Sequence, residues 1–267
     1  MSSGVYHTKL KNGTDSFRAS LTEKGAHISL GSYPTEKAAA KAYKEARALL
    51  ASSSAKISIN DIVFEKYSLY FDKIVILLNL RDNGIYIKTP IYLQKGFFNY
   101  YLSPSEVLRF DNDDLFYYST HKIMQRQGHL FVSDYGMQVS IMSRFGVKPF
   151  AVAGRDFEYV DGDKYNLSYA NIKVLSHYHG VYPEKNEFSE KFIAKIHING
   201  DFIIGRYSSE AKAAVAYNKA VDLCKAHGIN KNFPLNYVTE YTPSKYADVY
   251  SSIKISKRLQ TYCNLPS

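Results

Sequence analysis

The chain lacks tryptophan and contains only two cysteines, Cys224 and Cys263, among its 267 residues. Two cysteines are too few for a structural zinc site or a disulfide framework. Long apolar segments are missing too, since the longest run, residues 74–78, is far shorter than the roughly 20 residues that span a bilayer. The N-terminus shows no signal-peptide pattern. We therefore expect an intracellular protein without a membrane partner, in the cytoplasm or nucleoid, or in a nucleus or organelle if its source is eukaryotic.

Acidic residues are scarce relative to basic ones. The chain has 34 Lys and Arg against 25 Asp and Glu, a formal net charge of +9 and a pI near 9.2. A basic balance of this kind points first to a polyanion such as DNA or RNA. The hydrophobic share of 45% is ordinary for a folded protein, and 24 Tyr and 15 Phe provide a large aromatic surface. A chain of this length predicts two or three domains.

One sequence pattern occurs twice, at residues 4–50 and 180–226. From Gly31 and Gly205 onward the two copies align without a gap. The main shared positions are Gly4 and Gly180, Tyr6 and Tyr182, Phe17 and Phe192, Ala42 and Ala216, and Tyr43 and Tyr217. A repeat with this much internal order indicates one folding unit used twice.

Each copy predicts a small sheet followed by a helix. Apolar residues alternate with polar ones through residues 17–22, 28–30 and 192–197, which is typical of half-buried antiparallel strands. Lys24-Gly25 and Asn199-Gly200 supply turns between them. Thr35 and Ser209 stand at helix N-cap positions, before alanine-rich stretches with helical spacing. We expect a three-stranded antiparallel sheet backed by one helix in each copy.

Such a sheet leaves one face open for binding. A sheet of this width fits the major groove of DNA, where base edges can be distinguished. The predicted contact residues in the first copy are Tyr6, Thr8, Ser20, Thr22, His27 and Ser29. Those in the second copy are Tyr182, Lys195, His197 and Arg206, with Asp201 and Ile203 on the same predicted face.

The order Gly-Val-Tyr, Phe-x-Ala, Leu/Ile-Gly-x-Tyr and Ala-x-Ala-Tyr resembles the AP2/ERF DNA-binding domain. The resemblance covers roughly residues 3–50 and 178–236, and residues 228–234 look like the closing motif of that family. It implies a sheet that reads the major groove, largely through Arg and Trp side chains. The matching positions here mostly lack the Arg residues that contact guanine, so the resemblance supports the fold more strongly than it supports sequence specificity.

The middle of the chain is rich in expected strands. Asp82-Asn83-Gly84 predicts a hairpin turn between strands at residues 74–80 and 85–87. Residues 103–106, Ser-Pro-Ser-Glu, predict the start of a helix. Residues 51–54 mark a joint, which gives expected modules at residues 1–50, 51–177 and 178–236 and a tail at 237–267. For the tail we expect a solvated segment, with a short helix or a phosphate-binding arm as the alternatives.

Residues 158–163, followed by Asn171, resemble the core of HNH homing endonucleases, in which an AP2 module often follows. That family implies a ββα fold and a histidine base beside a divalent metal ion. Here Tyr159 stands at the position of the base, and a phenol with an ordinary pKa near 10 is a poor base at neutral pH. Glu158 replaces the metal-binding Asp, Asn171 matches the middle Asn, and His177 and His179 lie near the third position but displaced. We therefore predict vestigial positions without catalytic residues, bound metal or cofactor.

Together these patterns predict an α+β protein in which two sheet-and-helix modules flank a β-rich, HNH-like (ββα) domain. The leading hypothesis is a non-catalytic protein that binds duplex DNA, is derived from a mobile HNH–AP2 endonuclease and acts as a transcriptional, phage or mobile-element regulator. One alternative is an active HNH homing-type endonuclease that uses Mg²⁺. Another is a structural RNA-binding component of a ribosome-like particle. The sequence indicates no particular protein partner.

Overall fold

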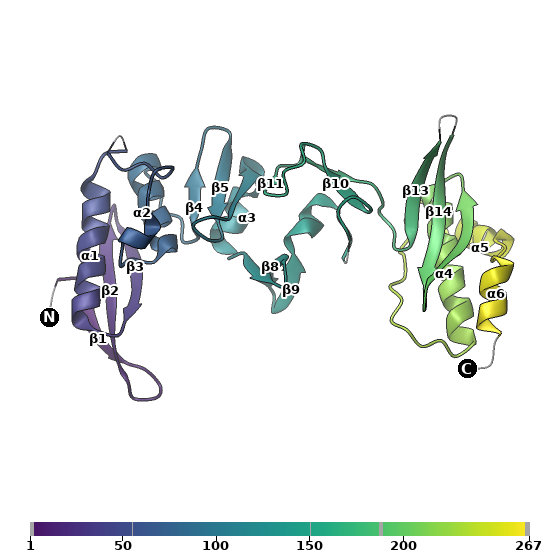
Figure 1. Ribbon diagram of the computed structural model, residues 1–267, viewed down its shortest axis with the longest axis horizontal. Coiled ribbons are helices and arrows are strands. Elements are labelled where there is room, and N and C mark those ends of the chain that lie inside the picture. Colours follow the sequence, from purple (N-terminus) through teal and green to yellow (C-terminus); the bar gives the residue numbers. More distant parts are fainter. Residues whose placement is uncertain (1–2, 55, 150, 187–188, 265–267) are drawn as a thin grey trace. The chain divides into compact units, whose positions relative to one another are not determined.

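The computed structural model describes residues 3–54, 56–149, 151–186 and 189–264 (Figure 1). The chain forms two compact units, one of residues 1–141 with 164–168 and the other of residues 142–163 with 169–267. Both combine small antiparallel sheets with few helices, which confirms the α+β class. Among the described residues, no helix is long and apolar enough to cross a membrane.

The first unit begins with the expected sheet and helix. Strands β1, β2 and β3 pair antiparallel in that order, and helix α1 covers one face (Figure 1). Lys24 and Gly25 both have positive φ, at 47° and 77°, as the tight turn between β2 and β3 requires. The Thr35 hydroxyl accepts a hydrogen bond from the Ala38 N–H at 3.2 Å and so starts the helix. The bounds are β1 Val5–Lys9, β2 Asp15–Glu23, β3 Ala26–Tyr33 and α1 Glu36–Ala51.

The second unit contains a second sheet and helix of the same arrangement. Strands β13, β14 and β15 pair antiparallel in order, and α4 packs on them. Both sheets have a register shift at the same place, opposite Ala19 and Ser20 of β2 and opposite Ala194 and Lys195 of β14. The extra residues are Leu30 in β3 and Ile204 in β15. The repeat predicted from the sequence is therefore a structural repeat. The bounds are β13 Val181–Asn186, β14 Ser189–His197, β15 Asp201–Tyr207 and α4 Glu210–Ala226.

Alanines bring each helix close to its sheet. Ala39 and Ala42 in α1, and Ala213 and Ala216 in α4, are completely buried in the two cores. Small side chains at helical spacing let the helix axis approach the strands, so this stripe is packing and not a binding site.

The remainder of the first unit contains further small sheets and helices. The core of the first module continues into α2, whose apolar residues share a cluster with α1 and the first sheet. The module boundaries expected at 50 and 177 stay predictions. The further elements are η1 Phe64–Lys66, α2 Phe71–Asn83, β4 Ile91–Leu93, β5 Phe97–Tyr101, β6 Val107–Asp111, η2 Asn112–Asp114, α3 Leu115–Thr120, β7 Met124–Arg126, β8 His129–Asp134, β9 Met137–Ser140 and β11 Asn166–Leu167. The sheets are β11-β6-β5-β4 and β7-β8-β9.

Two local predictions for this region were wrong. Residues 74–80 form a helix instead of a strand. The sequence pattern was misleading because every one of them is at most 2% exposed, and a helix buried on all sides shows no helical period. Gly84, at φ 74°, ends that helix by donating its N–H to the Leu80 carbonyl at 3.0 Å. Residues 103–106 begin no helix; they form a turn between β5 and β6, in which the Ser103 hydroxyl accepts the Glu106 N–H at 3.0 Å.

The second unit adds a small two-stranded sheet and two C-terminal helices. Strands β10 and β12 pair antiparallel, and the described residues between β12 and β13 form no helix, where a ββα fold would have one. Val249, Ile253 and Leu259 from the expected tail are buried in the hydrophobic core that α4 shares with β13, β14 and β15. The tail is therefore part of the core of the second module and is not a free arm. The bounds are η3 Ile141–Phe145, β10 Phe157–Tyr159, β12 Ile172–Val174, α5 Pro243–Ser252 and α6 Lys257–Cys263.

Candidate nucleic-acid interface

The first sheet has a polar face on the side opposite α1. The register places Tyr6, Arg18 and Ser32 side by side across β1, β2 and β3, and Thr22 opposite His27. Apart from Ser20, which is 9% exposed, and the half-buried Thr8, the predicted contact residues are exposed. The six predicted residues thus share one face: Tyr6, Thr8, Ser20, Thr22, His27 and Ser29.

Arg18 is the residue that the sequence analysis missed. It lies in the middle strand, exposed, and it makes no hydrogen bond or ion pair with any other described residue. Its position between the inward-facing Phe17 and Ala19 already indicated an outward side chain. An unpaired guanidinium at the centre of a sheet can donate two parallel hydrogen bonds to a guanine edge or a phosphate.

The second sheet has an apolar residue where the first has Arg18. Tyr182, Ile193 and Arg206 form the row that corresponds to Tyr6, Arg18 and Ser32. Arg206 donates from Nε to Glu184 at 2.8 Å, and His197 pairs with Asp201 at 2.7 Å. Two of the predicted contact residues, Arg206 and His197, therefore have acidic neighbours that weaken their electrostatic attraction for an anion.

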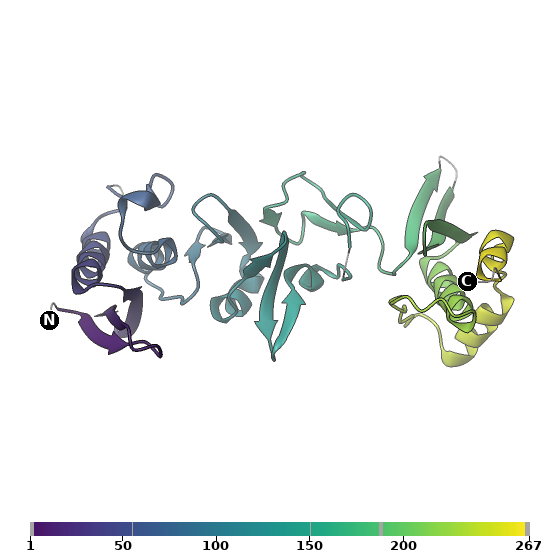
Figure 2. The same cartoon turned by 60° about the horizontal axis from the view of Figure 1, so that its bottom comes forward.

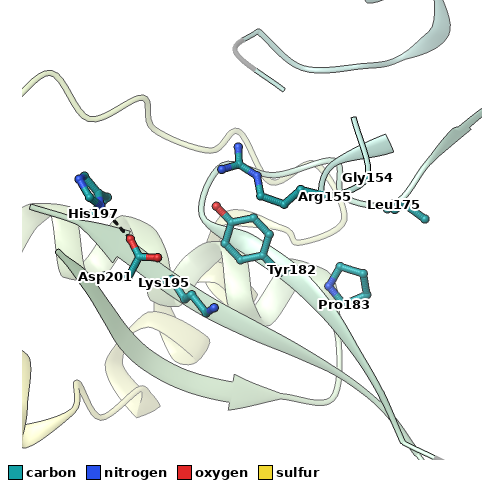
Figure 3. A pocket seen from close by; sticks show the side chains of 8 residues that line it. All are labelled: Gly154, Arg155, Leu175, Tyr182, Pro183, Lys195, His197 and Asp201. Carbon is teal, nitrogen blue, oxygen red and sulfur yellow. Dashed lines mark hydrogen bonds and ion pairs between the residues drawn. The ribbon is translucent and has the colours of Figure 1, made fainter. Parts of the chain in front are cut away.

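A loop of the same unit brings a cation to this face. The Arg155 guanidinium carbon lies 5.4 Å from the centre of the Tyr182 ring, and Lys195 Nζ lies 5.6 Å from it (Figure 3). Cations at this distance are attracted to an aromatic face. These three side chains, with His197 and Gly154, line a hollow of about 480 Å³ above the sheet. Arg155 thus brings a guanidinium to Tyr182, which is the cross-strand neighbour of Ile193.

Asp156 fixes the loop in place. Its side chain is 1% exposed and accepts hydrogen bonds from the Val152 N–H at 2.8 Å and from Arg155 Nη2 at 2.7 Å, while Lys148 Nζ lies 3.0 Å away. Burial alone would raise the pKa of Asp156, but the hydrogen bonds from Val152, Arg155 and Lys148 outweigh it and hold the pKa below its ordinary value. Arg155 keeps half of its side chain exposed, so it is both anchored and accessible.

Lys148 has a structural role. Besides Asp156 it donates to the Ser176 hydroxyl at 3.1 Å and to the Tyr178 carbonyl, and its side chain is 8% exposed. Burial lowers the pKa of Lys148, and the nearby Asp156 opposes that shift. Lys195 and Arg155 are the Lys and Arg residues that line the hollow beside Tyr182, and the exposed Lys191 lies farther along β14 on the same face.

His179 borders a second hollow of the same surface. Asn236 holds its backbone, accepting the His179 N–H at 2.7 Å and donating to its carbonyl at 2.9 Å. Burial and the charge of Lys148 lower the pKa of His179, so its imidazole is neutral at pH 7. The hollow also reaches residues 232–234 of the expected closing motif.

The expected vestigial catalytic positions all take part in local structure. Glu158 pairs with its cross-strand neighbour Lys173 at 2.8 Å. Asn171, 3% exposed, accepts the Asp161 N–H at 2.8 Å and donates to the Asp163 carbonyl at 3.0 Å, which closes the loop between β10 and β12. Burial raises the pKa of Tyr159 above its ordinary value.

The displaced histidines do not converge with these residues on a metal. His177 donates its N–H to Glu210 at 2.6 Å, and its ring lies 3.1 Å from the same carboxylate. In the part of the chain that the structure describes, no three His, Cys, Asp or Glu side chains are grouped so that they could hold a metal ion. No protein-family model, no curated protein and no solved structure matches the chain.

Proposed function

We propose that the protein binds duplex DNA through the open faces of its two repeated sheets and does not cut it. The observation that carries this proposal is a cation on each face that has no acidic partner among the described residues, Arg18 on the first and Lys195 on the second, each close to a tyrosine of the equivalent strand. The net charge of +9 supports a polyanionic partner.

The dimensions of the sheets fit this partner. Neighbouring strands lie about 4.8 Å apart, so three strands measure about 10 Å across, and the major groove of B-DNA is about 12 Å wide. Arg18 is the side chain best placed to contact a guanine, whereas the surrounding Ser and Thr residues suit phosphates and either kind of base pair. The proposal thus predicts strong affinity for the backbone and modest sequence specificity.

The absence of cleavage follows from the state of the HNH-like positions. Tyr159, with its raised pKa, holds its proton at neutral pH, and a positioned general base usually contributes about 10²–10⁴-fold to the rate. Glu158 and Asn171 already have partners within the β10–β12 segment. The origin from a mobile HNH–AP2 endonuclease and the regulatory role in a phage, a mobile element or transcription rest on the sequence resemblance alone.

RNA is the second candidate partner. Tyr6 is 57% exposed on the first sheet, and an exposed aromatic ring can stack on an unpaired base. A structural role in a ribosome-like particle would use this property.

The test is a titration of the full chain against duplex DNA, the single strand and RNA of the same sequence, at several salt concentrations, with and without Mg²⁺. We expect duplex binding whose affinity falls by roughly 0.9 log units per log unit of salt for each phosphate contacted. Arg18→Ala and Lys195→Ala should each reduce that slope, whereas Lys95→Ala, which removes a charge from the turn between β4 and β5, should not. Affinity that is insensitive to salt, or restricted to RNA, would overturn the duplex proposal, and cleavage of DNA with Mg²⁺ would overturn its non-catalytic part.

A further inference from the structure

The third three-stranded sheet, β7-β8-β9, also has an open polar face. Its register places Arg126 opposite His129, Met124 and Ser140 on either side of Phe131, and Ser133 opposite Gln138. Because successive side chains of a strand point to opposite faces, these residues share one side of the sheet. None of them is buried.

The opposite side of the sheet is the one that packs. Val132 is 1% exposed, and Leu130 and Val139, which alternate with the polar residues, are half-buried. The polar side, which we name the β7–β9 polar face, therefore points to solvent. Its residues are Met124, Arg126, His129, Phe131, Ser133, Gln138 and Ser140.

The charge of the β7–β9 polar face has one sign. Arg126 and His129 are its ionisable residues, and neither makes a hydrogen bond or ion pair with any other described residue. The nearest acid along the strand, Asp134, is on the packed side and lies 3.6 Å from His121 Nε2. The face thus offers a cation, an imidazole, an amide, hydroxyls and an aromatic ring, which are the groups that contact phosphates and bases.

Two tight turns keep this sheet in one register. Gln127-Gly128 and Tyr135-Gly136 have positive φ at both positions, 51° and 80° in the first turn and 47° and 78° in the second. Turns of this kind match the twist of antiparallel strands, so they hold the three strands in the register that places these residues on one face. Figure 2 shows β8 and β9 as a continuous hairpin.

We infer that the β7–β9 polar face is a third contact surface for duplex DNA, with Arg126 on a phosphate. This inference rests on the proposed function, because it assigns a further surface to the same partner. Charge complementarity selects that partner, since the face carries basic residues and no carboxylate, and its three antiparallel strands match the width of the two repeated sheets.

The first experiment uses the absence of tryptophan from the chain. In Gln138→Trp the single indole would lie on the polar face, and in Met137→Trp it would lie one residue away on the opposite side of the sheet. We expect saturating duplex DNA to quench the fluorescence of Gln138→Trp and to shield it from acrylamide, and to leave Met137→Trp unchanged. Equal protection of both positions, or protection of neither, would overturn the inference.

The second experiment measures the contribution of Arg126 to the salt dependence of binding. Arg126→Ala should lower the salt slope by about 0.9, as expected for the loss of one phosphate contact. Lys95→Ala serves as the control, because Lys95 is an exposed cation of the same unit outside this face. Wild-type protein that does not bind the duplex would remove both proposals, whereas binding that depends on Arg18 and not on Arg126 would remove this inference alone.

Discussion

Replacing Asp156 by Asn should strongly destabilise the second unit. The change keeps the shape of the side chain but leaves Lys148, 8% exposed, without its negative partner. Removing one member of a buried ion pair typically costs about 3–5 kcal/mol, because the remaining charge is desolvated and uncompensated. The matched control is Asp201→Asn, because Asp201 is 64% exposed and paired with His197 at the surface, where a pair contributes about 0–1 kcal/mol.

The effect should be measured locally, because the two units need not unfold together. Hydrogen exchange followed by mass spectrometry reports the peptides around residues 148–156 and 175–183 separately from those of the first unit. Adding Lys148→Met should recover part of the loss, since it removes the isolated charge, and Ser176 still donates to the Tyr178 carbonyl at 3.1 Å. A loss below about 1 kcal/mol for Asp156→Asn, or no recovery in the double variant, would refute the assigned role of the ion pair.

The same ion pair predicts a dependence on pH. Because the pKa of Asp156 is lower in the folded chain than its ordinary value of 3.8, its contribution to stability is fully present above that value. The contribution is lost as the pH falls through the lowered pKa of the folded state. The stability advantage of the wild type over Asp156→Asn, measured by urea unfolding of the second unit, should therefore shrink as the pH falls below 3.8.

Two further predictions concern the repeated modules. Cys224 and Cys263 have their sulfur atoms 3.8 Å apart and buried, so an azo oxidant such as diamide should join them, with two electrons and two protons reducing the oxidant to a hydrazine. Burial raises the pKa of Cys224 to about 12, so the oxidation should be slow at pH 7 and faster at higher pH. Formation of the disulfide would be measured as a mass loss of about two hydrogens. It should also raise Tm, because closing the 39-residue loop contributes up to about 4 kcal/mol to stability. Gly4→Ala should lower Tm more than Gly13→Ala, because both glycines have positive φ but the added Cβ meets the Tyr43 ring at 2.2 Å only at Gly4; equal losses in the two variants would contradict this.

The repeated modules were predictable because local signals agreed with the tertiary structure. Period-two alternation, the Lys24-Gly25 turn and the Thr35 cap each specify one element, and the sheet buries the side that the alternation marks. The helix at residues 71–83 was not predictable in this way, because a segment buried on every side carries no period.

The candidate site was predictable only in part. The face residues of both sheets follow from alternation, and Arg18 could have been included on the same ground. Arg155 could not have been found, because its place over Tyr182 depends on the folding of a loop from residues 152–156 that has no periodic pattern. The shared core of α1 and α2 also means that removing residues 1–50 would expose apolar surface of α2, so single substitutions test the modules more cleanly than deletions do.

The most direct test of the account asks whether both sheet faces touch the same kind of partner. Tyr6 and Tyr182 are replaced, one at a time, by photoreactive benzoylphenylalanine in the full chain, with the exposed Tyr237 as the control position. We expect illumination to cross-link both face positions to duplex DNA, added salt to reduce the yield, and position 237 to give no cross-link. Duplex cross-links absent from Tyr6 and Tyr182, or no stronger than those from Tyr237, would contradict it.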